Sequence, residues 1–436
     1  MPPAHWGRKP NALRIDNQGR VLRHLLFRGP LSRRDLVRLT DLMPSTISYV
    51  TAELLAAGVV TDLGGRARRD SSGRGRRSTL LDIVPNGAYA VGVHVGVQAV
   101  SAAITDLKGH VLSLDLIPVD LDLAPNDAVE QIATSITSLI ARSGVDQRRI
   151  VGVGAGVVGW VDPEHGIVRR APHPGWEDVP LRRLLSKRLG MPVVIERNVR
   201  AMAVAEKWFG HAAGAQNLIL VIHGTVVGAG LVVNGQIVQG TSHLAGQIGH
   251  IQVRADGPRC SCGKVGCLDA VASDAAMRQR ALTWSVEHPT SRLAHEVNSP
   301  DNALSVQGIF TAALDGDAMA REIVTDSACA LATALAPIVA ALDPEAIIVV
   351  GGITATRDLY FAPLQATLRD AIGDERGEIP FTVGPSALIP RAQPWLLPVI
   401  GGASLALQSF YMAPYHLAPL VAFSQEVKRV DSRHGG

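Results

Sequence analysis

Four residues with soft, metal-binding side chains stand close together in the sequence. They follow the order His-x9-Cys-x-Cys-x4-Cys, at His250, Cys260, Cys262 and Cys267. Three thiolates and one imidazole suit tetrahedral zinc with no open position, which is the structural type of site. The alternative is three buried thiols without a metal. The fourth cysteine, Cys329, stands in an alanine-rich segment and is expected to pack in a core.

Composition restricts the class of protein before any further motif is considered. The chain has 436 residues, of which 47% are hydrophobic and 19% charged, and this excludes a disordered chain. Four cysteines are too few for a disulfide scaffold. The N-terminus lacks an apolar signal core, so we expect a cytoplasmic protein. The length predicts two or three packed units.

The net charge of +3 is distributed unevenly along the chain. Residues 1–85 carry 15 Lys and Arg against 7 Asp and Glu, whereas the remainder carries 27 against 32. A basic N-terminal segment joined to a mildly acidic body indicates a polyanionic partner for one end only.

The basic segment has the pattern of a winged helix-turn-helix. Residues 16–28 predict a helix, Ser32-x-x-Asp35 predicts the capped start of a second one, and Pro44 begins a third that ends near Gly58. Residues 59–61 and 79–83 predict two strands with an arginine-rich loop between them. Residues 1–85 are therefore expected to bind DNA, although a small helical bundle with a basic loop is the alternative.

Three groups of residues in this segment are expected to contact DNA. The start of the third helix would face the major groove, nearby arginines would meet phosphates, and arginines of the wing would enter a minor groove. In that order, they are Ser45, Thr46, Ser48 and Tyr49; Arg33, Arg34 and Arg38; and Arg74, Arg76 and Arg77.

The rest of the chain alternates apolar strands with helices, which predicts an α/β architecture of two lobes. One long strand-like run extends from residue 91 to about 106, and further strands are expected at 150–158, 193–195, 218–223, 229–233 and 346–350. Helices are expected at about 126–142, 181–189, 199–208, 273–283, 317–341 and 361–373.

The body resembles the ROK family of repressors and sugar kinases over roughly residues 88–410. The resemblance rests on Gly249-His250, the Cys-x-Cys-Gly-x-x-Gly-Cys string at 260–267, the Gly-Thr-x-x-Gly-Ala-Gly string at 224–230, and the late glycine pairs at 351–352 and 401–402. It implies an actin-like, sugar-kinase-type (ribonuclease H-like) ATPase fold with a sugar site between two lobes. The implied domains are 1–85, 86–198 and 199–436, with C-terminal helices returning to the first lobe.

The chain departs from the kinases of that family at two positions. Their phosphate-binding Asp-x-Gly-Gly-Thr is matched by His94-Val95-Gly96-Val97-Gln98, and their catalytic aspartate by Asn198. An asparagine has no basic form that could take a hydroxyl proton, so both changes argue against an enzyme. The family's sugar-binding positions are matched by His173, Arg197, Asn198, Gln247, His250 and Asp269.

These observations predict a transcriptional regulator, most simply a repressor, that binds operator DNA as a homodimer or homotetramer and holds a structural Zn²⁺. A sugar or sugar-phosphate effector would control DNA binding, and Arg197 together with the lost carboxylates favours an anionic effector. Two alternatives stay open at this point: an active sugar kinase, and a ligand-independent DNA-binding protein that uses its body only to oligomerise.

Overall fold

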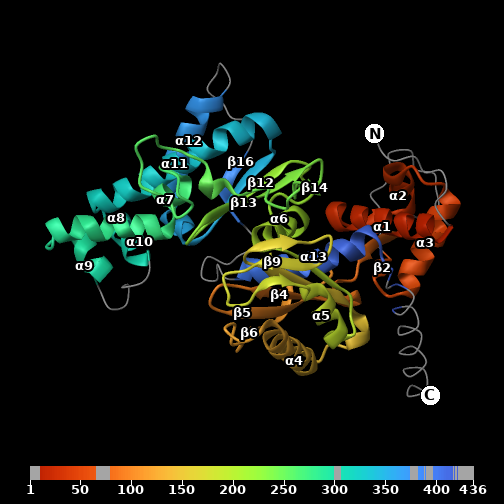
Figure 1. The fold of residues 1–436 in the computed structure, drawn as a ribbon. Coiled ribbons are helices and arrows are strands. Elements are labelled where there is room, and N and C mark those ends of the chain that lie inside the picture. Colours follow the sequence, from red (N-terminus) through yellow and green to blue (C-terminus); the bar gives the residue numbers. More distant parts are fainter. Residues whose placement is uncertain are drawn as a thin grey trace. The chain divides into compact units, whose positions relative to one another are not determined.

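The structure, a computed structural model, describes residues 10–64, 79–298, 306–373, 382–386, 388, 396–415, 417 and 420. The chain forms two compact units (Figure 1). The first takes in residues 1–204 and 398–436, and the second residues 205–397. Each unit contains a five-stranded sheet.

The N-terminal part of the first unit is a winged helix-turn-helix, as predicted. Its sheet is antiparallel with the order β1-β3-β2. The predicted capping box is present, because Ser32 Oγ accepts from the Asp35 N–H at 3.2 Å while Asp35 Oδ2 accepts from the Ser32 N–H at 3.1 Å. The first helix begins six residues earlier than predicted. The elements are α1 (Pro10–Arg28), β1 (Leu31–Ser32), α2 (Arg33–Thr40), α3 (Pro44–Ala56), β2 (Val60–Asp62) and β3 (Leu80–Ile83).

The α/β part of the first unit is a mixed sheet with the strand order β11-β7-β4-β5-β6. Strands β11, β7 and β4 run parallel, and β4, β5 and β6 form an antiparallel meander. The strands are β4 (Tyr89–Val95), β5 (Val100–Asp106), β6 (Val111–Ile117), β7 (Ile150–Val157) and β11 (Val193–Arg197). The helices are α4 (Pro125–Ser143), α5 (Leu181–Leu189), α6 (Asn198–Phe209) and α13 (Leu396–Met412).

The predicted single strand over residues 91–106 is wrong. The chain reverses between β4 and β5, where the Gly96 N–H donates to the Ala99 carbonyl at 3.0 Å. Residues 97–99 are exposed in this turn, although Val97 continues the apolar pattern of the strand. Only Gly96 marked the turn in the sequence, which is why the apolar run was read as continuous.

Helix α13 packs very closely against the sheet of the first unit. A Cβ on Gly402 would lie 2.7 Å from the main-chain oxygens of Gly154 and Val93, in strands β7 and β4. A Cβ on Gly401 would lie 2.9 Å from the backbone of Ala201 in α6. Gly401 and Gly402 are therefore required because the backbone of α13 lies too close to the strands β7 and β4 and to α6 to leave room for a side chain.

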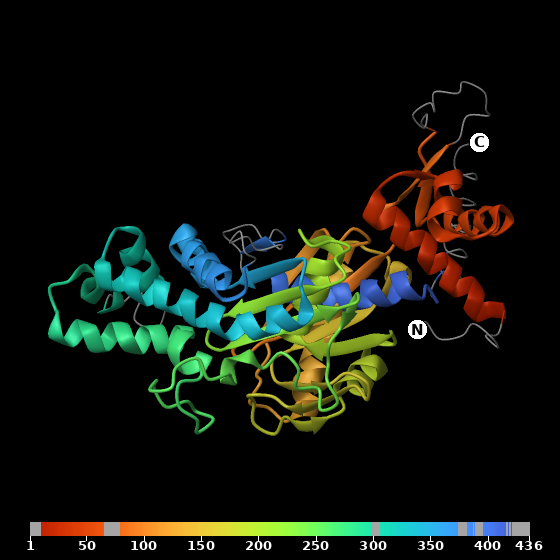
Figure 2. The same cartoon turned by 90° about the horizontal axis from the view of Figure 1, so that it is seen from above.

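The second unit has a sheet with the order β14-β13-β12-β15-β16. Helices α11 and α12 pack against each other, and α8, α9 and α10 lie together in both views (Figures 1 and 2). The strands are β12 (Leu218–His223), β13 (Val227–Val233), β14 (Gln236–Ile237), β15 (Ala346–Val350) and β16 (Thr382–Pro385). The helices are α7 (Leu268–Ala272), α8 (Asp274–Glu287), α9 (Arg292–Asn298), α10 (Gln307–Leu314), α11 (Ala318–Leu342) and α12 (Asp358–Ile372).

Helix α11 is long and apolar enough to cross a membrane by length and composition alone. It is instead a core helix of the second unit, since Ile323, Leu331 and Leu335 on it are almost completely buried. Its apolar character therefore reflects packing between the sheet and α12.

Candidate functional site

The four predicted metal ligands converge at one point of the second unit. Their ligand atoms all lie within 4.8 Å of one another. Cys262 Sγ is 3.6 Å from Cys267 Sγ, and Cys260 Sγ is 3.7 Å from His250 Nδ1. Sulfurs that share a tetrahedral zinc lie about 3.8 Å apart, given Zn–S bonds of about 2.3 Å. The donor set and its spacing therefore fit a metal ion held by His250 Nδ1 and three sulfurs.

Glycines shape the loop that carries the cysteines. Gly263 has a φ of +89°, and its N–H donates to the Cys260 carbonyl at 2.9 Å, which closes a turn around the first two cysteines. Gly266 has a φ of +69°, and a Cβ there would lie 1.6 Å from the Arg254 carbonyl oxygen. Without a cation, burial and the neighbouring thiols raise the pKa of Cys267 to about 12. A bound cation would favour the thiolate instead.

Asp269 lies between the metal cluster and the strand β13. Its Oδ1 accepts a hydrogen bond of 2.6 Å from the Val227 N–H, and its Oδ2 is 3.9 Å from His250 Nδ1. The carboxylate also lies against Gly249, where a Cβ would come within 2.4 Å of it. Gln247, two residues before Gly249, is exposed. The structure thus places Gln247, His250 and Asp269 in one region of the second unit.

His94 lies at the end of β4 in the first unit, half-buried as a residue but with its ring atom Nδ1 fully buried. Burial lowers the pKa of its imidazole to about 4, despite a hydrogen bond to the Gly156 backbone. The ring is therefore neutral at pH 7. Its Nε2 is 3.0 Å from the position that a Cβ on Gly96 would take, so the imidazole supports the turn between β4 and β5.

His173, a predicted ligand contact, is 8% exposed and holds the same turn. Its Nε2 lies 3.0 Å from the Gly96 carbonyl oxygen, to which it donates. Its ring also meets the edge of Trp176, with the two centroids 5.7 Å apart. His173 therefore contacts the Gly96 turn from a segment 77 residues further along the chain, whereas His94 adjoins it from β4.

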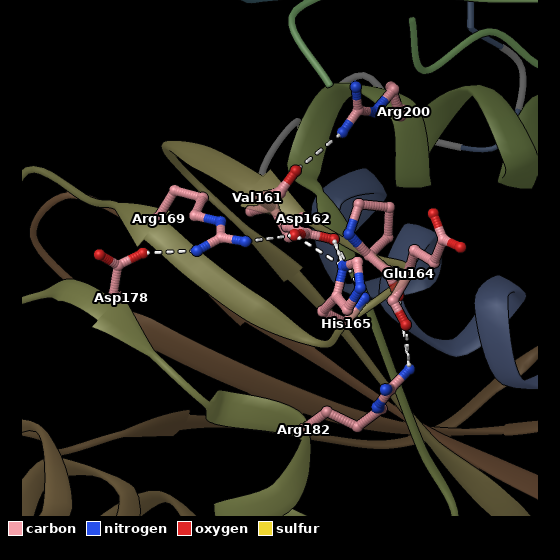
Figure 3. Close-up of polar contacts among 9 residues, drawn as sticks. Val161, Asp162, Glu164, His165, Arg169, Asp178, Arg182 and Arg200 are labelled. Carbon is pink, nitrogen blue, oxygen red and sulfur yellow. Dashed lines mark hydrogen bonds and ion pairs between the residues drawn. The ribbon is translucent and has the colours of Figure 1, made fainter. Parts of the chain in front are cut away.

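Arg197 and Asn198 lie where β11 meets α6, as predicted from the sequence. The Arg197 N–H donates to Glu196 Oε1 at 2.6 Å. The same carboxylate forms an ion pair of 2.6 Å with Arg200, and both side chains are buried. A guanidinium nitrogen of Arg200 also reaches the Val161 carbonyl at 3.5 Å (Figure 3). This buried pair fixes the first turn of α6 and hence the position of Asn198.

A polar network beyond Val161 shapes the small sheet β10-β9-β8, in which β8 is Trp160–Asp162, β9 is Ile167–Arg170 and β10 is Glu177–Val179. Arg169 joins Asp162, at 2.7 Å, to Asp178, at 2.9 Å (Figure 3). Burial opposes ionisation of Asp162, but hydrogen bonds from His165 and Arg169 hold its pKa well below the usual range. This network was not predicted from the sequence, because its acidic and basic residues resemble those of an ordinary polar turn.

The N-terminal helix α3 presents the surface expected of a DNA-recognition helix. Ser45, Ser48 and Tyr49 are exposed and Thr46 is half-buried, whereas Ile47 packs in the core. The Ser48 hydroxyl donates to the Pro44 carbonyl at 2.9 Å, within its own helix.

The predicted phosphate-binding arginines differ in their surroundings. Arg38 is 78% exposed at its side chain and pairs with Asp35. Arg34 is exposed, whereas Arg33 is half-buried and donates to Thr51 Oγ1 at 3.1 Å. The Arg33 side chain is therefore held by a hydrogen bond within the N-terminal segment. The wing residues Arg74, Arg76 and Arg77 lie outside the described residues.

One arginine beside α3 was missed because it precedes the predicted start of the first helix. Arg14 pairs with Glu53 at 2.6 Å, and its guanidinium lies 5.9 Å from the centre of the Tyr49 ring. Gln18 donates to the same Glu53 carboxylate at 2.7 Å. Arg14 thus places a guanidinium, paired with Glu53, beside the exposed Tyr49 of α3.

Comparison with known proteins decides the family. The family model described as ROK matches residues 90–408. The chain belongs to the ROK family. This match contains the metal cluster and the two sheets of the body.

Among its relatives, the ROK chain is 27% identical to the xylose repressor of Bacillus subtilis over 394 residues, which cover 90% of this chain and 95% of that one. It is 32% identical to a glucokinase of Halalkalibacterium halodurans over 278 residues, which cover 64% of this chain and 84% of the other. A solved ROK family transcriptional regulator, a homologue of the E. coli Mlc protein, superposes with a TM-score of 0.80 at 27% identity. That match covers 94% of this chain and 100% of that structure. The regulators thus match more of the chain than the kinase does.

Proposed function

We propose that this ROK protein is a sugar-responsive transcriptional repressor and not an enzyme. The observation that carries the proposal is the N-terminal winged helix-turn-helix with its exposed recognition helix, joined to a ROK body. Ser45, Ser48 and Tyr49 would read base edges in the major groove, with Thr46 at the margin of that face. The relatives named as repressors match over most of the chain, including the body that carries the metal cluster.

Phosphates would be contacted from both sides of the recognition helix. Arg34 and Arg38 supply exposed positive charge, and we add Arg14 on the strength of its position beside Tyr49. Arg33 would act by holding α2 against α3. The wing arginines Arg74, Arg76 and Arg77 remain a prediction from the sequence.

Two replacements argue against phosphoryl transfer on chemical grounds. His94 stands where the kinases of the family have an aspartate, and a buried neutral imidazole supplies no negative charge for Mg²⁺. Asn198 stands where they have the catalytic base, and its amide cannot accept the hydroxyl proton. We expect either replacement alone to reduce the rate of phosphoryl transfer strongly, and this chain has both.

The metal that fits the cluster is zinc in a structural role. The ligands would be His250 Nδ1 and the sulfurs of Cys260, Cys262 and Cys267, which leave no open coordination position. When bound, the ion would replace the thiol protons and fix the loop between η3 (Ile248–His250) and α7. His250 would then present its other ring nitrogen, Nε2, to a ligand.

The effector we propose is a sugar or a sugar phosphate. In the second unit, Gln247, His250 and Asp269 offer hydrogen-bonding groups suited to hydroxyls. In the first unit, the corresponding side chains are His173, Arg197 and Asn198. An effector can weaken DNA binding only to the extent that it prefers the conformation with the lower DNA affinity. We further propose that the protein acts as a homodimer or homotetramer on double-stranded operator DNA.

The first test uses the full-length protein to select duplexes from a pool of fragmented genomic DNA. The binding of the selected duplexes is then measured again in the presence of a panel of sugars and sugar phosphates. Enrichment of a common sequence, and its release by one class of sugar, is the expected result. The kinase alternative predicts sugar-dependent ATP turnover that Asn198→Ala abolishes. The ligand-independent alternative predicts specific DNA binding that no sugar changes.

A further inference from the structure

The turn between β12 and β13, at Gly224 to Val227, is a natural candidate for an anion site. Backbone N–H groups in such a turn point outward and attract negative charge. Thr225 and Val226 are exposed at its tip. The Val227 N–H, however, already donates to Asp269 Oδ1 at 2.6 Å. One of the donors of the turn is therefore occupied by a carboxylate of the protein itself.

A second carboxylate lies at the other end of the same turn. Asp274 is the first residue of α8, and its N–H donates to the Gly224 carbonyl at 2.9 Å. Its Oδ2 lies 4.0 Å from the position that a Cβ on Gly224 would take. The backbone of Asp274 is therefore bonded to the same turn that its carboxylate adjoins.

A buried histidine lies on the other side of the Asp274 carboxylate. His223 Nδ1 lies 3.8 Å from Asp274 Oδ1, and among the residues that the structure describes neither atom has a hydrogen-bond partner. His223 Nε2 is 2.9 Å from Ser327 Oγ, which itself donates to the Ala272 carbonyl. Because the Ser327 hydroxyl donates its proton to that carbonyl, His223 Nε2 is the donor towards Ser327 Oγ.

Tyr360 is the other buried group near this carboxylate. Its ring packs edge-on against His223, with the centroids 5.6 Å apart. Burial and the charge of Asp274 raise the pKa of the Tyr360 phenol, which therefore stays neutral. The Asp274 carboxylate lies beside the turn, where its negative charge would repel a phosphate at short range.

We propose that Asp269 and Asp274 fill the Gly224–Val227 turn with the protein's own negative charge and so close it to phosphate groups, with Asp274 as the residue that determines this specificity. The inference deepens the proposed function and rests on it, since it specifies that the body of this regulator rejects nucleotides. The phosphate of an anionic effector would have to be received outside this turn.

The test measures the binding of inorganic pyrophosphate and of ATP to the full-length protein by calorimetry at low ionic strength. Asp274→Asn keeps the shape of the side chain and removes its charge, while Asp274→Gly removes the side chain as well. Both should bind pyrophosphate at least about tenfold more tightly than the wild type, because one repulsive charge within a few ångströms is lost. Glu287→Gln makes the same charge change on an exposed residue at the other end of α8 and is the matched control.

Equal pyrophosphate affinity in the wild type and both variants, whether measurable or below detection, would overturn the proposal. So would a gain of the same size in Glu287→Gln, which would show a general effect of net charge. The assay requires neither DNA nor sugar, so a negative result would leave the proposed repressor untouched, and a protein that fails to bind DNA could still confirm the role of Asp274.

Discussion

The phenol of Tyr411 donates a hydrogen bond of 2.6 Å to the main-chain carbonyl of Leu107, across 304 residues of sequence. The bond is buried and fixes the last turn of α13 just beyond the end of β5. On its other side, the Tyr411 carbonyl accepts from Arg23 of α1 at 3.0 Å. Within the first unit, α13 therefore connects the sheet of the body to the first helix of the DNA-binding segment.

Removing the Tyr411 hydroxyl should destabilise this connection. Tyr411→Phe leaves the buried Leu107 carbonyl without its donor, which costs about 1–3 kcal/mol in the free energy of unfolding. Chemical denaturation followed by circular dichroism would measure the change. Tyr415→Phe is the control, because that side chain is 70% exposed and its loss should cost little. A Tyr411→Phe protein as stable as the wild type would show that the bond contributes nothing.

Metal binding should depend on the three clustered cysteines and not on the fourth. Cys262→Ser is expected to reduce the zinc content from about one ion per chain to near zero and to lower the midpoint of thermal unfolding. Cys329→Ser should retain the metal, since Cys329 lies on α11, does not belong to the cluster, and accepts a weak bond from Thr367. Elemental analysis of the purified variants measures this directly. Full zinc content in Cys262→Ser would rule out the proposed ligand set.

Stability should fall in acid because His94 is buried in its neutral form. Its folded pKa of about 4 lies below the unfolded value of about 6.5, so the unfolded chain binds the proton more tightly. His94 therefore contributes stability above pH 6.5, and this contribution, about 3 kcal/mol, is lost as the pH falls towards 4.

The variant His94→Gln should remove that part of the pH dependence. The free energy of unfolding, measured between pH 4 and pH 7.5, would then decline less steeply than in the wild type. His211→Gln, at an exposed position of the second unit, is the control. Parallel curves for His94→Gln and the wild type would mean that the imidazole is not held neutral by burial.

DNA binding should show the salt dependence of a few defined phosphate contacts. Arg38→Ala is expected to weaken binding and to reduce the slope of log affinity against log salt concentration by about one. Arg183→Ala removes an equally exposed arginine from α5 of the same unit, far from α3 in sequence, and should leave the slope unchanged. Fluorescence anisotropy at several salt concentrations would distinguish the two. Equal slopes for all three proteins would remove Arg38 from the interface.

Much of this structure could be predicted because its signals are local. The cysteines of the metal cluster stand within eight residues of one another, and the capping box at Ser32 and Asp35 depends on four residues. The recognition helix was predicted for the same reason, from Pro44 at its start and an apolar face at helical spacing.

The rest depends on tertiary contacts that a sequence does not display. Glu196 and Arg200 are spaced like an ordinary surface pair on a helix, yet both are buried. Gly224 and Asp274 are fifty residues apart, and only the fold brings the carboxylate to the turn. Arg14 was missed because the predicted helix began after it, although the helix extends back to Pro10.

The central claim is that this ROK body controls a DNA-binding segment through a sugar-type effector. The most direct test measures the fluorescence anisotropy of a duplex, recovered from the genomic DNA, bound to the full-length protein. Sugars and sugar phosphates are then titrated into this complex at constant salt. The account predicts saturable binding that is specific for that duplex over a scrambled one and that one effector class reduces. Specific binding that no sugar or sugar phosphate changes would contradict it, and so would equal affinity for the scrambled duplex.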